Sequence, residues 1–173
     1  MPRKIVLFLI ISICFVLETT TFQSLSFANI SPNLLIIVVS SFGFMRGKKE
    51  GMYVGFFCGL LMDIFFGFYL GIYALLYMYI GYMNGFFQKR FYPEDIKLPL
   101  LLIAGSNLVA SLFTYLFMFF FRGRFDIVYY FKAIIIPELV YTMVISIFLY
   151  FILLKANQKL EAYEKRRAIK FDL

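Results

Sequence analysis

Three acidic residues, Glu18, Asp63 and Glu138, lie inside long apolar stretches of this chain. A charged side chain at the centre of a bilayer costs about 2.5–3.5 kcal/mol unless it meets a partner or water, so these residues are candidate functional groups. Two carboxyl groups of different pKa could act as general acid and general base if both approached one substrate. The spacing of the three residues along the chain does not indicate such an approach.

The rest of the composition argues against catalysis. The 173 residues include no histidine, which removes the commonest general base and the commonest metal ligand. The chain has no phosphate-binding loop ending in Gly-Lys-Ser/Thr, no Gly-x-Ser-x-Gly and no His-Glu-x-x-His. Its cysteines, Cys14 and Cys58, lie in separate apolar stretches and are expected to be small hydrophobic residues. We therefore expect a protein that is not an enzyme and uses no cofactor or metal.

Asp63 belongs to a series of small residues that recurs every four positions. The series comprises Gly51, Gly55, Gly59, Asp63, Gly67 and Gly71. Residues four apart lie on one side of a helix, and small residues at this spacing let a second helix approach closely in lipid. The series predicts a surface for helix packing or for a partner, and its carboxylate either caps a helix at the extracellular interface or binds a ligand. Gly43 and Gly47 share the spacing but lie beside a charged turn, so we do not assign them to this surface.

Further polar residues in the apolar stretches are expected to connect helices. Asn84, Ser106 and Asn107 can form interhelical hydrogen bonds, which typically contribute about 0.6 kcal/mol each. Pro137 directly precedes Glu138. A proline inside a helix frees a backbone carbonyl group and kinks the helix, and neighbouring groups must then satisfy that carbonyl.

The elements that position these residues are membrane helices. The chain is 62% hydrophobic, contains 24 Phe and 13 Tyr, and has a mean hydropathy of +0.85. A soluble domain of this size could not cover so much apolar surface with polar groups. The composition predicts an all-α, polytopic membrane protein in which residues 1–173 form one integral membrane domain.

Six apolar stretches can each form a membrane helix. They cover approximately residues 5–22, 27–45, 51–68, 70–87, 98–121 and 127–154, and a basic tail follows at 155–173. A helix needs about 20 residues to cross about 30 Å of hydrocarbon, which the fifth and sixth stretches provide. The second stretch is the weakest, because its purely apolar part is short and Ser31-Pro32-Asn33 interrupts its start.

The distribution of basic residues favours six crossings with both termini in the cytoplasm. This topology leaves only Arg122, Arg124 and Lys132 of the 17 Lys and Arg residues outside, a strong positive-inside bias. A five-crossing alternative, in which the second stretch does not span, also moves Arg3 and Lys4 outside and is less favoured. The same distribution concentrates positive charge at the cytoplasmic face. The basic tail there is either a solvated helix end or a segment attracted to anionic lipid, and neither interpretation requires a nucleic-acid partner.

The N-terminal segment also has the layout of a secretory signal peptide. Basic Arg3-Lys4 precede an apolar run, and Ser26-Phe27-Ala28 could form a cleavage site. Because cleavage would remove the first helix and leave an odd number of crossings, we expect this segment to remain as a membrane helix.

Several motifs resemble the rod shape-determining protein MreD family. The similarity is most specific over residues 31–85: Ser31-Pro32-Asn33-Leu34-Leu35, a basic turn, the run from Gly51 to Asp63, Leu70-Gly71 and Tyr79-Ile80-Gly81-Tyr82. It extends to the whole chain through length, segment order, Glu18 at the end of the first stretch and Pro137 in the last. The chain differs from the family pattern in carrying Thr142 where that pattern has an asparagine.

The resemblance implies a function beyond what the residues alone indicate. It implies a non-enzymatic scaffold in the bacterial inner membrane that serves the cell-wall elongation complex of rod-shaped cells. The implied partners are a bitopic MreC-like protein and, through it, an MreB-like actin, a RodA-like glycosyltransferase and a penicillin-binding transpeptidase. The implied fold is a six-helix bundle similar to the substrate-binding subunits of energy-coupling vitamin transporters.

That fold similarity supplies an alternative function. In it, the chain is a membrane-embedded subunit that binds a small solute, and Asp63, Glu18 and Glu138 line an outward-facing cavity of roughly 300 Å³ or more. In the scaffold hypothesis, the glycine series and these carboxylates pack the bundle or receive the partner's transmembrane helix. A channel or proton-coupled carrier is less favoured, because the carboxylates are few and form no repeating charged ring.

Overall fold

The protein is all-helical in the computed structural model, which describes residues 2–21, 31–67, 70–90, 92, 96–122 and 127–171. In chain order the elements are α1 (Pro2–Val16), η1 (Leu17–Thr21), α3 (Leu34–Arg46), α4 (Lys48–Phe66), α5 (Ile72–Asn84), η2 (Gly85–Arg90), α6 (Lys97–Arg122), α7 (Ile127–Tyr130), η3 (Phe131–Ile135) and α8 (Ile136–Phe171). The short elements extend their neighbours: η1 continues α1, η2 continues α5, and α7 with η3 leads into α8. Counted in this way, the described residues form six helices and no strand, which confirms the predicted helical class.

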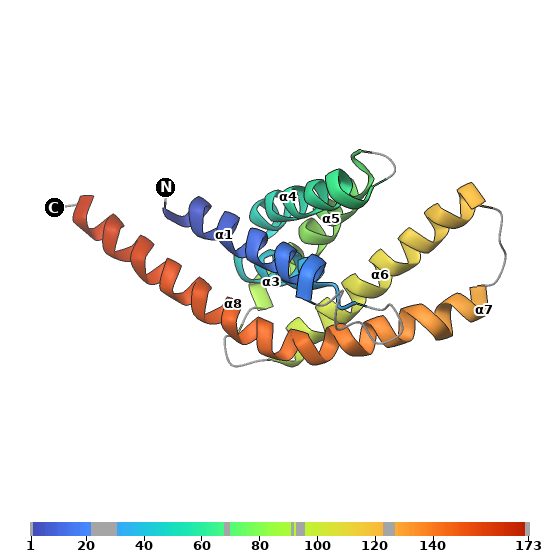
Figure 1. Ribbon diagram of the computed structural model, residues 1–173. Coiled ribbons are helices and arrows are strands. Elements are labelled where there is room, and N and C mark those ends of the chain that lie inside the picture. The colour runs from blue at the N-terminus through green and yellow to red at the C-terminus, as the bar shows by residue number, and fades with distance from the viewer. Residues whose placement is uncertain are drawn as a thin grey trace.

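α3 is the central helix of the bundle. Residues 34–45 are all buried, and the helix contacts α1, α4, α5, α6 and α8 (Figure 1). A helix that is apolar on every side is expected to be buried on every side. Apart from Ser40 and Ser41, residues 34–45 are apolar, and all of them are buried. At its start Oδ1 of Asn33 accepts a hydrogen bond from the N–H of Ile36 at 3.1 Å, which caps the helix.

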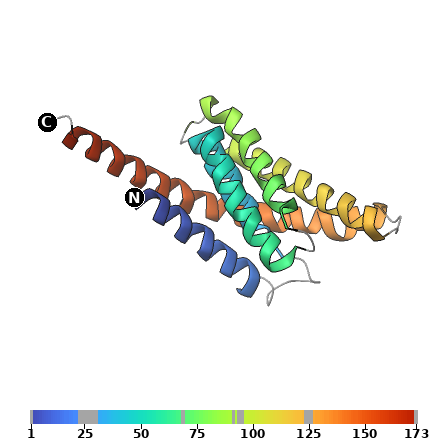
Figure 2. The same ribbon diagram turned by 90° about the horizontal axis from the view of Figure 1, so that it is seen from above.

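The last two helices run along the other side of the molecule. α6 and α8 diverge from a shared contact, and α8, with 36 residues, passes beneath the remaining helices in Figure 1. In both views its C-terminal end lies on the same side of the molecule as the N-terminus (Figures 1 and 2). The basic tail predicted from Lys155 is therefore a continuation of α8, because residues 155–171 contain no glycine or proline to end the helix.

By length and composition, two described stretches could cross a membrane, Lys97–Phe117 and Val128–Lys165. α3 is a shorter apolar helix of 13 residues, which rises about 20 Å at 1.5 Å per residue. It begins only at Leu34, since the preceding Pro32 and Asn33 favour a helix start rather than a helix interior. The first residues of the predicted second stretch, 27–30, and the signal-like Ser26-Phe27-Ala28 lie outside the described residues.

Candidate functional site

The glycines of the four-residue series lie against α5. α4 and α5 run side by side and make the most extensive contact between any two described elements (Figures 1 and 2). A Cβ atom added to any of three glycines of α4 would overlap a backbone carbonyl oxygen of α5. The three pairs are Gly51 with Gly81, Gly55 with Tyr77 and Gly59 with Tyr73. The missing side chains thus allow the two backbones to touch, and a helix of the same chain covers this face.

Gly43 takes part in the same contact, although its position beside a charged turn gave no reason to expect this. A Cβ atom added to Gly43 would lie 2.6 Å from the carbonyl oxygen of Gly81, and one added to Gly51 would lie 2.7 Å from the Cα of Gly43. Glycines of α3, α4 and α5 therefore meet where these three helices cross.

Asp63 caps α5. Its carboxylate accepts hydrogen bonds from the N–H groups of Gly71 at 3.0 Å, Tyr73 at 3.0 Å and Ala74 at 2.8 Å, which belong to the cap and first turn of that helix. The side chain is buried, with 2% of the residue's surface exposed. Gly67 ends α4 and Gly71 begins α5 with φ +104°, so both serve the connection between the helices rather than the packing face.

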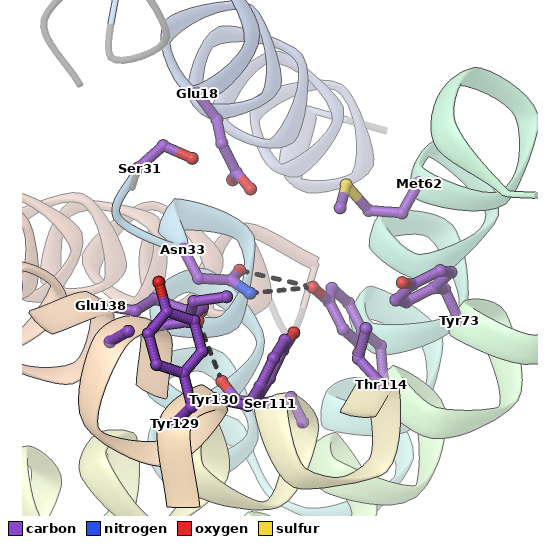
Figure 3. Close-up of a pocket in the computed structure, with 14 residues that line it drawn as sticks. Glu18, Ser31, Asn33, Met62, Tyr73, Ser111, Thr114, Tyr129, Tyr130 and Glu138 are labelled. Carbon is purple, nitrogen blue, oxygen red and sulfur yellow. Dashed lines mark hydrogen bonds between the residues drawn. The ribbon is translucent and has the colours of Figure 1, made fainter. Parts of the chain in front are cut away.

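A cavity of about 580 Å³ lies beside this helix pair and is lined by residues from seven parts of the chain (Figure 3). The lining residues are Glu18 of η1; Ser31 and Asn33 before α3; Met62 of α4; Tyr73 and Tyr77 of α5; Ala110, Ser111 and Thr114 of α6; Tyr129, Tyr130, Ala133 and Ile134 of α7 and η3; and Glu138 of α8. The cavity brings together two of the three predicted carboxylates, Glu18 and Glu138. The third, Asp63, is not in its lining.

Glu18 joins the end of the first helix to the start of α3. Its Oε2 accepts a hydrogen bond from the N–H of Leu35 at 3.0 Å, in the first turn of α3, where the helix dipole favours a negative charge. Glu18 lies in the π-helical turn η1, where the hydroxyl of Thr19 donates to the carbonyl of Phe15 at 2.9 Å. In Figure 3 its carboxylate points away from its own helix toward Asn33.

Glu138 enters the cavity from the start of α8. Its Oε2 accepts a hydrogen bond from the hydroxyl of Ser111 on α6 at 3.2 Å. The kink expected at Pro137 is preceded by the π-helical turn η3, in which the N–H of Ile136 donates to the carbonyl of Phe131. Both cavity carboxylates therefore lie within, or a few residues after, a π-helical turn, which changes the direction of the side chains that follow it.

The cavity has a closed end and an open end. At the closed end, Tyr77 is 1% exposed, and its hydroxyl lies 3.2 Å from Nδ2 and 3.3 Å from Oδ1 of Asn33. The backbone N–H of Asn33 donates to the hydroxyl of Thr142 at 3.2 Å, which fixes this segment against α8. At the open end, Tyr129 is 73% exposed. A ligand could enter beside Tyr129 and reach the Asn33–Tyr77 pair.

The remaining predicted polar residues lie outside the cavity. Nδ2 of Asn84 donates to the hydroxyl of Ser106 at 2.8 Å, and this hydrogen bond joins α5 to α6. Asn107 is 1% exposed, and neither atom of its amide group has a hydrogen-bond partner in the part of the chain that the structure describes.

Sequence reasoning missed most of the cavity lining. Tyr73 and Tyr77 are four residues apart, and Ser111 and Thr114 are three apart, so each pair lies on one helix face. These spacings were visible in the sequence, but such pairs are common in membrane helices and do not identify a site. Within the described residues, no cluster of three or more His, Cys, Asp or Glu side chains could hold a metal ion.

The helical architecture, the two long apolar helices and the polar cavity define a helical membrane protein. The family model described as rod shape-determining protein MreD matches residues 2–160, and the chain belongs to this family. The family acts in the determination of rod shape and is not a known enzyme family. No curated protein and no solved structure matches the chain.

Proposed function

We propose that this chain is a non-enzymatic scaffold of the cell-wall elongation complex in the bacterial inner membrane and that it binds a bitopic MreC-like partner. Through that partner it would associate with an MreB-like actin, a RodA-like glycosyltransferase and a penicillin-binding transpeptidase. The observation that carries the proposal is the match to the MreD family over residues 2–160. A sequence without histidine and without the common catalytic motifs also favours a scaffold over an enzyme.

Co-purification of the full chain with the MreC-like protein of the same cell tests this proposal. We expect the partner to be retained after detergent extraction, whereas an unrelated bitopic membrane protein of similar length is not. Cells depleted of the chain should lose their rod shape and regain it when the chain is expressed again. If the MreC-like protein is not retained and cells keep their normal shape after depletion, the scaffold function is refuted.

The glycine face is a poor candidate for the partner interface, because α5 already covers it. The partner's helix would have to bind another face of the bundle. We therefore expect Gly55→Leu to lower the amount of folded protein rather than to release the partner selectively. A Gly55→Leu variant that folds normally but no longer retains the partner would assign the interface to this face after all.

We also propose six membrane crossings with both termini in the cytoplasm. Support comes from α3, whose two ends contact α8 at positions far apart along that helix. Near the start of α3, Asn33 bonds to Thr142, and at its end Arg46 bonds to Asn157 and lies 3.1 Å from Glu164. The helix from Thr142 to Asn157 rises about 22 Å, so α3 runs along most of the hydrocarbon thickness.

Reporter fusions test this topology. A reporter that is active only in the cytoplasm should be active when fused after Lys4 and after Lys170, and a periplasmic reporter should be active between α6 and α7. An inactive cytoplasmic reporter at the N-terminus, with an active one at the C-terminus, would instead support five crossings.

A second candidate function, the binding of a small molecule, is favoured by the cavity. Its volume of about 580 Å³ exceeds the roughly 300 Å³ that a ligand site requires, and no phenylalanine is among the described residues that line it. In this proposal the helical bundle holds a small solute, as the substrate-binding subunits of vitamin transporters do. Glu18 and Glu138 belong to the binding site, and Asp63 only caps α5. Stabilisation of the purified chain by a soluble ligand would support it. If no compound stabilises the chain, the cavity is a space between helices that solvent or lipid fills.

A further inference from the structure

We propose that the cavity binds a primary ammonium group, which Glu18 and Glu138 hold by charge-assisted hydrogen bonds. This proposal goes beyond scaffolding and specifies the ligand class of the second candidate function. It rests on three features of the cavity: its uncompensated negative charge, the unused hydrogen-bonding capacity of its carboxylates and its tyrosine rings.

The charge of the lining is uncompensated. Among the described residues that line the cavity, two are acidic and none is Lys or Arg. Elsewhere in the same chain an acidic pair is balanced: Arg46 lies 3.1 Å from Glu164 and 4.0 Å from Glu161. Carboxylates that are partly withdrawn from water need a cation or several hydrogen-bond donors nearby. A positively charged ligand would supply what the cavity wall lacks.

The two carboxylates also have acceptor positions to spare. Within the described residues, Glu18 receives hydrogen bonds from the N–H groups of Leu35 and Leu34, and Glu138 receives one from the hydroxyl of Ser111. An ionised carboxylate has about four acceptor sites, and Asp63 in this chain uses three. A primary ammonium group carries three N–H donors, whereas a trimethylated ammonium group carries none. The unused acceptors therefore favour the primary amine.

The aromatic residues suit the same ligand. Four tyrosines, Tyr73, Tyr77, Tyr129 and Tyr130, contribute to the lining. The face of an aromatic ring attracts a cation within about 6 Å, and the attraction is stronger where water is excluded. The exposed Tyr129 marks the entrance, so an amine could reach the carboxylates either as a free solute or as the headgroup of a lipid.

Thermal unfolding of the full chain in detergent tests the proposal. The chain has no tryptophan, but Cys14 and Cys58 are free and buried, so a thiol-reactive fluorescent dye reports unfolding. The ligands are ethanolamine, choline as its trimethylated counterpart and ethylene glycol as a neutral counterpart. We expect ethanolamine to raise the unfolding temperature at a half-saturating concentration about tenfold below that of choline, because choline donates no N–H hydrogen bond. A second arm compares nanodiscs of phosphatidylethanolamine with nanodiscs of phosphatidylcholine.

Substitutions locate the effect. Glu18→Gln and Glu138→Gln remove the charge but keep an oxygen that can accept from Leu35 and Ser111, so both should fold and both should weaken ethanolamine binding by about tenfold or more. Glu161 of α8 lies beside Arg46, at the end of α3 that is far from Glu18. A Glu161→Gln variant removes this carboxylate and should bind ethanolamine normally.

The outcomes separate this proposal from the function it specifies. Stabilisation confined to the nanodisc arm would identify a lipid headgroup as the source of the amine, and stabilisation by free ethanolamine would identify a solute. Equal stabilisation by choline, or an ethanolamine effect that persists in both glutamine variants, would overturn the ammonium site. Stabilisation by ethylene glycol without any by ethanolamine would refute the ammonium site and leave the cavity as a ligand site. No stabilisation by any of these compounds in either arm would refute both the ammonium site and the ligand-binding function that it specifies.

Discussion

The contact between α4 and α5 and the cavity beside it each contain buried or partly buried carboxylates, but the two regions are built in opposite ways. In the contact, glycines allow two backbones to touch, and the carboxylate of Asp63 is buried and bonded to three N–H groups. In the cavity, large side chains surround an open volume, and among the described residues Glu18 accepts hydrogen bonds from Leu34 and Leu35 while Glu138 accepts one from Ser111. The comparison shows that the backbone uses most of the acceptor positions of Asp63 and fewer of those of Glu18 and Glu138, which is the basis for the ligand site proposed above.

The largest expected effect concerns the saturated carboxylate. Asp63→Ala removes the acceptor of three N–H groups at the start of α5, so we expect the free energy of unfolding to fall by at least about 3 kcal/mol. Reversible unfolding in a denaturing detergent measures this change. Asp63→Asn keeps one acceptor oxygen, so its free energy of unfolding should lie between those of the native chain and Asp63→Ala. An Asp63→Ala variant as stable as the native chain would show that the cap does not stabilise α5.

The glycine contact should be the next most sensitive. A Cβ atom at Gly55 would overlap the backbone of Tyr77, which cannot move aside as a flexible side chain could, so Gly55→Ala should cost about 2 kcal/mol. Gly105 on α6 is the matched control, because an added Cβ there meets nothing within 4 Å. Gly105→Ala should raise the stability by about 0.5–1 kcal/mol, since alanine favours a helix interior over glycine. Equal effects of the two substitutions would remove the distinction between packed and open glycines.

A smaller effect is expected at the hydrogen bond that joins α5 to α6. Asn84→Ala should cost about 0.6 kcal/mol, the typical contribution of such a bond within a membrane. A double-mutant cycle with Ser106→Ala isolates this contribution from the loss of packing. If the two effects simply add, the pair does not interact in the membrane.

The smallest effect on stability is expected at the cavity. Glu18→Gln keeps an acceptor for the N–H of Leu35, so the free energy of unfolding without ligand should change by less than about 0.5 kcal/mol. The same unfolding experiment measures it. A loss as large as that of Asp63→Ala would mean that Glu18 is a structural cap like Asp63, and the comparison between the two regions would no longer hold.

Local features made the glycine region largely predictable. The spacing of Gly51, Gly55 and Gly59 follows the helical repeat, so a close contact could be expected before its partner was known. Capping by Asp63 was one of two alternatives, and the three N–H groups of α5 decide between them. The identity of the covering helix was not predictable, because it depends on the path of the chain after Gly67.

The cavity was much less predictable. Glu18 and Glu138 are far apart in the sequence, and their approach depends on the two π-helical turns and on the packing of α3 between them. The expectation that Asp63 lines the cavity with them was wrong, since its carboxylate is turned toward the start of α5. Nothing in the sequence indicates which carboxylate the backbone will saturate.

The sequence alone therefore determined the properties that repeat along the chain: its helical class, its membrane character, the closely packed glycine face and the family to which it belongs. The first three follow from hydrophobicity and from the helical period, which act locally, and the family follows from motifs that can be read along the chain. The tertiary structure decided which helix covers the glycines, which carboxylates remain available and where an open volume lies. Those outcomes depend on distant segments that meet in space, and only the packing of the whole bundle specifies such meetings.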